Sequence, residues 1–300
     1  MNLATIQWDP PIEERIHFLL NMIKNCEGCH RSCHINRYQS NKTYCRTGIH
    51  PFLYSFKKIE DDLFISKEKL LYLYFQHCNL RCVYCIDYDL HQGPSNEEKK
   101  LTIDEYATLL RDNIDSTIKG IYLSNVDHII PHTIYALYQL LKEGILPPIL
   151  FESNGFALNT TINFLKDLIT VYIVNFKFIS PHFARRYLKE EDYPKIAKDT
   201  VLEMYKQVGD CKIENECIQK GLIVKLLILP GFTEEYKKIL DYVVQISPKI
   251  GIFILSQYKP AGKVLNQELY KEIRRTTPKE EILEIFEYSK KLNFHFIKIF

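Results

Sequence analysis

The chain has 300 residues, 46% hydrophobic and 25% charged, which is typical of a globular protein with a sizeable core. Its 39 basic and 37 acidic side chains leave a formal charge of +2, and this balance disfavours nucleic-acid binding by bulk electrostatics. No stretch reaches the roughly 18 apolar residues of a membrane span, and residues 1–10 lack the features of a signal peptide. We therefore expect a cytoplasmic protein without a nucleic-acid or membrane partner.

Cysteine is unevenly distributed, because seven of the nine cysteines lie between residues 26 and 85. The cytoplasm is reducing, so disulfide bonds are rare there. The crowding therefore predicts metal ligands or reactive thiols rather than a disulfide framework.

The chain divides into two parts by pattern. Residues 1–69 show no repeating pattern and contain four cysteines, which indicates a cysteine-rich N-terminal segment. From residue 70 to residue 300, short apolar runs alternate with amphipathic helical patterns. The runs are nearly continuous in apolar residues, as in strands that are covered on both faces. They span residues 70–75, 120–123, 148–151, 171–178, 222–229, 250–255 and 294–299.

Two of the intervening helices have recognisable starts. Thr102 followed by Glu105 forms a capping box, and Thr277-Pro278 followed by Glu280 predicts a second one with Thr277 as the N-cap. The repeated alternation of strands and helices predicts a parallel α/β sheet with right-handed crossovers. A wholly or partly closed (β/α) barrel fits best, with a doubly wound sheet as the alternative.

The strongest functional signal follows the first apolar run. Cys78, Cys82 and Cys85 have the spacing C-x3-C-x2-C, and the carboxyl end of a strand is where such folds place their sites. Three thiolates suit three irons of a 4Fe–4S cluster and leave the fourth iron open for a ligand. The alternatives are three inert thiols or a zinc site completed by His77 or His91.

The spacing, with the aromatic Tyr84 before the third cysteine, resembles the radical S-adenosylmethionine (SAM) superfamily. Over residues 26–262 the chain resembles more closely the proteins related to the pyruvate formate-lyase activating enzyme. The motifs that carry this resemblance are Cys26-x2-Cys29-x3-Cys33-His34, Tyr44-Cys45-Arg46, Cys82-Val83-Tyr84-Cys85, Glu152-Ser153-Asn154-Gly155, Asn175-Phe176-Lys177, Val224-Lys225 and Leu229-Pro230-Gly231.

The resemblance implies a partial (β/α)6 barrel, a 4Fe–4S cluster on the three cysteines, and SAM bound across the strand ends. Glu152, Ser153 and Asn154 would contact the ribose or methionine part of SAM, and Tyr84 would lie near the adenine. Lys177 and Lys225 would face the SAM carboxylate or the substrate. Asn154-Gly155 is equally an ordinary turn signal, whereas an ammonium within an apolar strand, as at Lys177, needs a polar partner.

The chain departs from the family after the second strand. The usual Gly-Gly-Glu-Pro motif, which binds the SAM amino group, is replaced by residues 124–128, Ser-Asn-Val-Asp-His. Asn125 or Asp127 would then have to supply the missing acceptor. Either SAM binds in a modified manner, which we favour, or the protein retains the cluster without the chemistry.

Four further cysteines, Cys26, Cys29, Cys33 and Cys45, are numerous enough for a second metal site. Their spacing suits an auxiliary iron–sulfur cluster or a structural zinc ion, and the sequence does not separate the two. His128 and His132 flank Pro131, which predicts a helix start rather than a metal-binding pair on one helix face.

Together these features predict an enzyme that reductively cleaves SAM to a 5′-deoxyadenosyl radical and abstracts hydrogen from a substrate. A low-potential donor such as ferredoxin or flavodoxin would supply the electron. The sequence does not identify the substrate; a backbone glycine of a partner protein is one candidate, by analogy with glycyl-radical activation. The alternatives are a non-catalytic iron–sulfur protein for electron transfer on a degenerate barrel, and a zinc-stabilised scaffold.

Overall fold

The computed structural model describes residues 11–61, 63–64 and 69–300. Residues 1–10, on which the signal-peptide prediction rests, lie outside the described part. Within that part, no helix combines the length and the apolar character needed to cross a bilayer.

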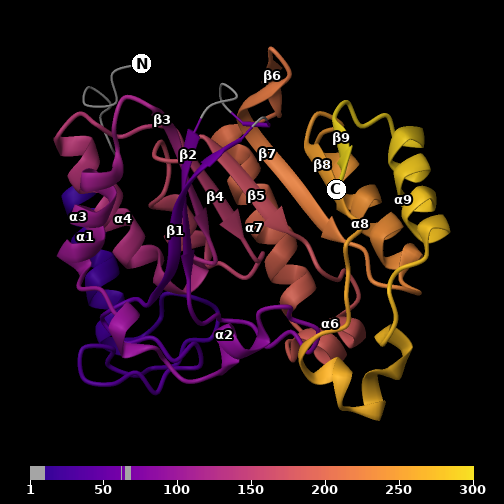
Figure 1. Cartoon of the computed structure of the whole chain (residues 1–300), viewed down its shortest axis with the longest axis horizontal. Coiled ribbons are helices and arrows are strands. Elements are labelled where there is room, and N and C mark those ends of the chain that lie inside the picture. Colours follow the sequence, from indigo (N-terminus) through magenta and orange to yellow (C-terminus); the bar gives the residue numbers. More distant parts are fainter. Residues whose placement is uncertain (1–10, 62, 65–68) are drawn as a thin grey trace.

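The described strands form one twisted sheet, whose order is β1-β2-β3-β4-β5-β7-β8-β9, with β6 paired to β7 (Figure 1). From β2 to β9 every neighbouring pair on this path is parallel. The predicted α/β fold with a parallel sheet is therefore confirmed, and the order is consistent with a partial barrel. The strands are β1 (Leu53–Glu60), β2 (Lys69–Phe75), β3 (Ile118–Ser124), β4 (Ile149–Ser153), β5 (Val171–Asn175), β6 (Lys212–Glu214), β7 (Cys217–Leu227), β8 (Gly251–Leu255) and β9 (Ile297–Ile299).

Helices connect the strands and cover the sheet on its outer side (Figure 1). They bury the apolar residues of the central strands, and β4 and β5 are buried over most of their length. Inside the sheet, strand residues such as Leu150, Val171 and Ile223 pack against one another in a second buried cluster. Because both faces of the strands are covered, their sequences are nearly continuous apolar runs. The α-helices are α1 (Ile12–Met22), α2 (Tyr88–Gln92), α3 (Ile103–Asn113), α4 (Ile130–Lys142), α5 (Asn159–Asn163), α6 (Pro181–Leu188), α7 (Tyr193–Val208), α8 (Thr233–Ile246) and α9 (Lys279–Lys291).

The two predicted capping boxes have different outcomes. The side chain of Thr102 accepts from the Glu105 N–H, and Glu105 reaches back to the Thr102 N–H, so the first box is confirmed. The second is wrong, because Pro278 occupies the N-cap position of α9 and makes no side-chain cap. The Thr277 hydroxyl instead donates to the Ile228 carbonyl at 2.5 Å. A buried carbonyl of the preceding strand region thus competes successfully for the hydroxyl that would have capped the helix.

The N-terminal part of the chain contributes to the sheet. β1 pairs antiparallel with β2 and forms one end of the sheet, while β9 forms the other. Between α1 and β1 the chain is mostly irregular and lies at the lower edge in Figure 1, near α2. This is the edge at which the parallel strands end. The division at residue 69 stays a prediction, since β1 lies before it and packs with the strands after it.

Candidate functional site

The loop after β2 carries the three clustered cysteines. Cys78 and Cys82 are buried and Cys85 is half-buried, and all three line a cavity of about 550 Å³ at the carboxyl ends of the strands. The Cys78 Sγ accepts from the Leu80 N–H and from the Asn154 Nδ2, each at 3.4 Å. N–H groups directed at a sulfur stabilise the thiolate form, which is the form that binds metal.

The C-terminal part of the chain fixes the same loop from the other side. The Val83 N–H donates to the Tyr187 carbonyl at 2.9 Å, and the Val83 carbonyl accepts from the Lys263 N–H at 2.8 Å. Gly262 has a φ of +58°, and a Cβ at this position would lie 2.8 Å from the Val83 oxygen. Glycine is therefore required where residues 261–265 pass over the loop.

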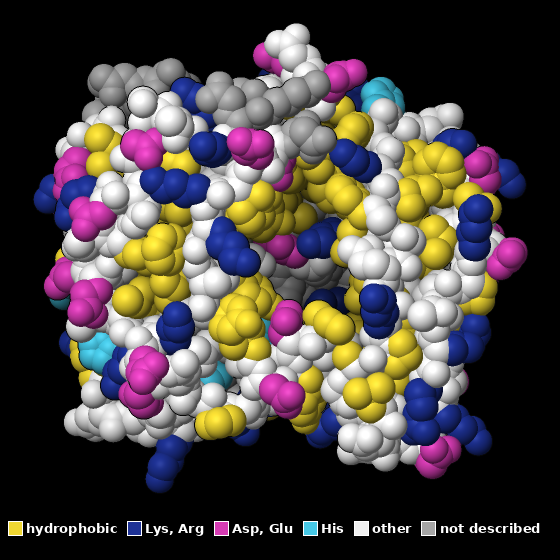
Figure 2. All heavy atoms as spheres, in the orientation of Figure 1, with side chains coloured by type: hydrophobic (Ala, Val, Ile, Leu, Met, Phe, Trp, Pro, Cys, Tyr) yellow, Lys and Arg dark blue, Asp and Glu magenta, His cyan; other side chains and the backbone are white. Residues whose placement is uncertain are grey.

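The cavity is formed by residues at the ends of six strands and by the loops that follow them. Figure 2 shows this face hollowed near its centre, with both basic and acidic side chains in the walls. Of the residues predicted to bind the cofactor, all but one line the cavity. These are Tyr84, Asn125, Glu152, Ser153, Asn154, Lys177 and Lys225, and the exception is Asp127.

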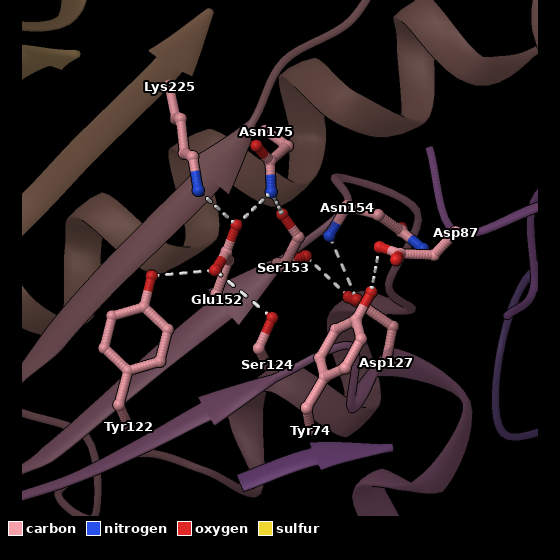
Figure 3. Close-up of polar contacts among 10 residues, drawn as sticks. All are labelled: Tyr74, Asp87, Tyr122, Ser124, Asp127, Glu152, Ser153, Asn154, Asn175 and Lys225. Atoms are coloured by element: carbon pink, nitrogen blue, oxygen red, sulfur yellow. Dashed lines mark hydrogen bonds and ion pairs between the residues drawn. The ribbon is translucent and has the colours of Figure 1, made fainter. Parts of the chain in front are cut away.

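Glu152, at the end of β4, is the centre of a hydrogen-bond network (Figure 3). Its carboxylate pairs with the Lys225 ammonium at 2.7 Å and accepts from the Asn175 Nδ2 at 2.7 Å. The hydroxyls of Tyr122 (2.7 Å) and Ser124 (3.2 Å) donate to its other oxygen. Burial opposes ionisation, but the Lys225 charge and these hydrogen bonds outweigh it and lower the pKa of Glu152 to about 2.

Asp127 is also buried, but its hydrogen bonds come from neutral groups at the end of β4. It is 1% exposed, and its carboxylate accepts from the Ser153 hydroxyl (2.5 Å) and from the Asn154 N–H (3.0 Å). Burial raises the pKa of Asp127 to about 6, although these two hydrogen bonds oppose the rise. Asp127 therefore holds the turn after β4 in place, and its predicted contact with the SAM amino group stays a prediction without support from its position.

Asn125 occupies the place of the family's glycine pair. Its φ of +58° lies in the left-handed region, which asparagine tolerates better than most residues. Its Nδ2 donates to the carbonyls of Phe75 (3.0 Å) and His77. The side chain thus ties the end of β3 to the start of the cysteine loop while it faces the cavity.

Lys177 lies just beyond β5, which ends at residue 175 rather than at the predicted 178. Its backbone N–H donates to the Tyr193 hydroxyl at 3.1 Å. Within the described part of the chain, its ammonium forms no hydrogen bond or ion pair. Burial raises the pKa of the Cys78 thiol to about 12, and the positive charge of Lys177 counteracts part of that rise. Lys177 is therefore a positive group beside the cysteines that is available to an anionic ligand.

Tyr84 is buried and packs edge-on against two rings, Phe178 and Tyr258, with centroid distances of 6.3 and 6.4 Å. Tyr84 and Tyr258 line the cavity as an aromatic wall, and Phe178 packs behind them. The resemblance implies the adenine on this side of the cavity. The contact with adenine stays a prediction.

Sequence reasoning missed the role of Tyr74, and it considered His91 only as a zinc ligand. The Tyr74 hydroxyl donates to Asp87 (2.7 Å) and lies 3.1 Å from the His91 Nε2, and the His91 Nδ1 lies 3.4 Å from the Cys85 Sγ. Burial lowers the pKa of His91 to about 4, so the ring is neutral near pH 7. Side chains two residues apart on a strand face the same side, so Tyr72 and Tyr74 of β2 share one face. This alternation could have predicted that Tyr74, at the strand end, faces the site.

A second, smaller cavity of about 400 Å³ lies beside the first. It shares Tyr74, Ser124, Glu152 and Lys225 with the main cavity, and Ser55, Lys57 and Ile59 of β1 form its outer wall. The stacked rings of Tyr72 and Tyr122, 4.4 Å apart, also line it. The site therefore extends sideways, towards the β1 edge of the sheet.

The four N-terminal cysteines are free thiols; Cys26, Cys29 and Cys45 are buried and Cys33 is half-buried. Among the described residues, no group of three or more His, Cys, Asp or Glu side chains is arranged to hold a metal ion. The same holds for the three cysteines of the loop after β2 and for His128 and His132. α4 begins at Ile130 with Pro131 in its first turn, so the predicted helix start between the two histidines is confirmed.

A three-cysteine loop at the carboxyl end of the first parallel strand of an α/β sheet is an arrangement typical of iron–sulfur proteins. The profile of the Radical SAM superfamily matches residues 72–243, so the chain belongs to this superfamily. Membership implies a 4Fe–4S cluster and SAM as cofactors. The residues fit the cluster and SAM. Each cysteine of a 4Fe–4S cluster binds a different iron, so the three thiols need not meet at one ion. They line one cavity together with the ammonium of Lys177, which has no partner among the described residues.

One curated relative is the uncharacterized protein MJ0674 of Methanocaldococcus jannaschii, 24% identical over 300 residues, which cover 95% of this chain and 80% of the relative. Among solved structures, Streptococcus suis SuiB bound to precursor peptide SuiA has a TM-score of 0.47 and 12% identity over 74% of this chain. SuiB bound to S-adenosylmethionine has a TM-score of 0.45 and 11% identity over 75%. The chain spans 46% and 44% of the length of these two SuiB chains.

Proposed function

We propose that the protein is an iron–sulfur enzyme in which Cys78, Cys82 and Cys85 hold the cluster and the adjoining cavity binds SAM. The single observation that carries the proposal is that the three thiols line one cavity with the ammonium of Lys177, which is unpaired within the described part of the chain. When bound, the cluster would supply the electron for reductive cleavage of SAM, which leads to abstraction of a hydrogen atom from the substrate.

The residues of the chain have separate tasks in this proposal. Lys177 binds the carboxylate of SAM, because its ammonium lines the same cavity as the three cysteines and has no hydrogen-bond or ion-pair partner among the described residues. The Lys225–Glu152 pair fixes a negative and a positive charge in the wall at 2.7 Å and so orients polar groups of the ligand. Asn125 and Asp127 hold the loops whose glycines the family would otherwise use. The aromatic wall at Tyr84 excludes water from the apolar part of the ligand.

The resemblance to activating enzymes supports a protein substrate, with a backbone glycine as the hydrogen donor. The side cavity next to β1 is consistent with a substrate larger than the main cavity can enclose. An external donor such as ferredoxin or flavodoxin would reduce the cluster. The glycine substrate and the external electron donor are proposed from the resemblance.

The decisive experiment measures 5′-deoxyadenosine after anaerobic reconstitution, reduction and addition of SAM. Production above that of a Cys82→Ala control supports the enzyme. A full, reducible cluster that produces none would contradict it and favour the electron-transfer alternative. Iron and sulfide are counted on the same samples, so that a missing cluster is not mistaken for missing chemistry.

The Lys177 assignment has a test of its own. Lys177→Met should raise the KM for SAM about 10- to 100-fold, since a hydrogen bond to a charged group contributes about 1.5–3 kcal/mol. The exposed Lys195 on α7 is the matched control, and Lys195→Met should leave KM unchanged. An unchanged KM in Lys177→Met would show that the SAM carboxylate binds elsewhere.

A further inference from the structure

The irregular segment between α1 and β1 brings four cysteines together. The chain folds back so that the Cys26 N–H donates to the Ile35 carbonyl at 3.1 Å, which brings Cys33 next to Cys26. The Tyr44 N–H donates to the Cys33 Sγ at 3.3 Å and so places the following residue, Cys45, on the same side. Cys29 lies on the turn between them and is 9% exposed. Thiols from three separate turns are therefore gathered and withdrawn from solvent.

Hydrogen bonds hold these thiols close to one another. The side chains of Cys26 and Cys33 form a hydrogen bond, and the His34 N–H donates to the Cys26 carbonyl at 3.3 Å. The Thr43 hydroxyl lies 3.4 Å from the Cys45 Sγ. Thiols gathered in this way are suitable ligands for a metal ion, which binds them as thiolates.

Arg37 supplies an independent observation. It is 3% exposed, and its guanidinium donates only to carbonyl groups, those of Gly48 (3.1 Å) and His128 (3.0 Å). Its Nη2 has no partner, and no carboxylate pairs with it among the described residues. A buried guanidinium without an anion is costly and rare in a folded protein.

The cysteines beside Arg37 are the groups that could give its guanidinium an anionic partner. Arg37 lies two residues after Ile35, whose carbonyl accepts from the Cys26 N–H at 3.1 Å. The Arg37 N–H itself donates to the Ile23 carbonyl at 2.9 Å, so the backbone of Arg37 runs beside the start of the cysteine segment. Four thiolates around a divalent ion, or around an oxidised 4Fe–4S cluster, carry a net negative charge. Such a centre would neutralise Arg37 and give its free N–H groups sulfur acceptors.

We propose that Cys26, Cys29, Cys33 and Cys45 bind a second metal centre as four thiolates, with Arg37 as its buried counter-charge. Four thiolates select zinc or an iron–sulfur cluster. The sulfurs are not yet arranged around an ion, but neither are those of Cys78, Cys82 and Cys85, whose cluster the family implies. Metal binding would draw the thiolates together in both sets.

The second centre would support the first. The Arg31 Nε donates to the Asn79 carbonyl at 2.9 Å, inside the cluster loop. The guanidinium groups of Arg31 and Arg81 both stack on the ring of Tyr44, at 3.9 and 4.2 Å from its centroid. Tyr44 is also the residue whose N–H binds Cys33. The metal centre would therefore hold the segment that contacts the cluster loop.

The experiment removes the three cysteines proposed to hold the first cluster and measures whether metal stays bound to the rest of the chain. The full chain with Cys78→Ser, Cys82→Ser and Cys85→Ser is purified without oxygen, and its iron, zinc and sulfide are measured. We expect metal to remain bound, as zinc without sulfide or as iron with equivalent sulfide. Adding Cys29→Ser and Cys45→Ser should remove it, whereas adding Cys211→Ser, the matched control, should not.

Folding is followed by circular dichroism. A folded triple variant that holds neither zinc nor iron would overturn the proposal. If the triple variant does not fold, the wild-type protein decides: zinc, or more iron than one 4Fe–4S cluster contains, supports a second centre. Wild-type protein with one cluster and nothing more overturns it. Arg37→Met should release the metal to a chelator several-fold faster than wild type, and Arg37→Lys should restore part of the retention.

Discussion

Two buried carboxylates at neighbouring strand ends behave in opposite ways. Glu152 on β4 has a cation at 2.7 Å and a pKa near 2, whereas Asp127 after β3 has only neutral donors and a pKa near 6. Both are removed from water, so burial alone does not decide the charge. The comparison teaches that Lys225 makes Glu152 a permanent charge in the cavity wall, while Asp127 is a structural group that changes its charge between about pH 5 and 7.

The largest expected effect comes from removing the cation. Lys225→Met leaves Glu152 buried without its partner and should lower the free energy of unfolding by about 3–5 kcal/mol. Denaturant unfolding measures this loss, and Lys220→Met, at an exposed position of the same strand, is the control. If both variants were equally stable, the charge of Glu152 would not depend on Lys225 and the comparison would fail.

An intermediate effect comes from a single hydrogen bond to the charged group. Tyr122→Phe removes a hydroxyl that donates to Glu152 and should cost about 1.5–3 kcal/mol. The buried Tyr172 donates to the neutral Gln207 at 2.9 Å, so Tyr172→Phe should cost only about 0.5–1.5 kcal/mol. Equal losses in the two variants would indicate that Glu152 is protonated.

The smallest effect is the pH dependence that Asp127 contributes. Its pKa is raised from 3.8 to about 6 in the folded protein, so the folded state binds the proton more tightly than the unfolded state. This contribution is fully present below about pH 4 and is lost as the pH rises through about 6. Between about pH 5 and 7 it should lower the stability by about 1–2 kcal/mol.

Asp127→Asn should flatten this part of the profile, as measured by urea unfolding across the same pH range. The variant retains an oxygen for the Asn154 N–H, so a difference in slope reports the titration rather than the loss of every hydrogen bond. A slope identical to that of the wild type would assign the pH dependence to other groups.

The sequence was sufficient to predict what depends on local pattern. Continuous apolar runs predicted the parallel strands, and the rule that sites lie at strand ends predicted that the three cysteines would lie there, where they line a cavity. Lys177 was singled out because an ammonium within an apolar strand needs a partner; the structure places it two residues beyond the end of β5, in the cavity wall. These features depend on residues that are close in the chain or on a general rule about strand ends.

What the sequence could not predict depends on contacts between distant residues. β1 was missed because its exposed residues lack an apolar run, and its place is set by pairing with β2. Thr277 was assigned to a cap because nothing local reveals the Ile228 carbonyl that takes its hydroxyl. Asp127 was expected to face the ligand, but the hydroxyl and N–H groups that hold it come from the end of β4.

The outer wall of the side cavity has a consequence for how this protein can diversify. β1 is an edge strand, and its residues Ser55 and Lys57 form part of the wall of that cavity, whose lining contains no cysteine. Substitutions there would reshape the entrance while the loop with Cys78, Cys82 and Cys85 keeps its supports. In the function proposed above, substrate specificity could therefore change independently of the loop that carries the cysteines, which makes β1 a natural place for directed evolution towards a new substrate.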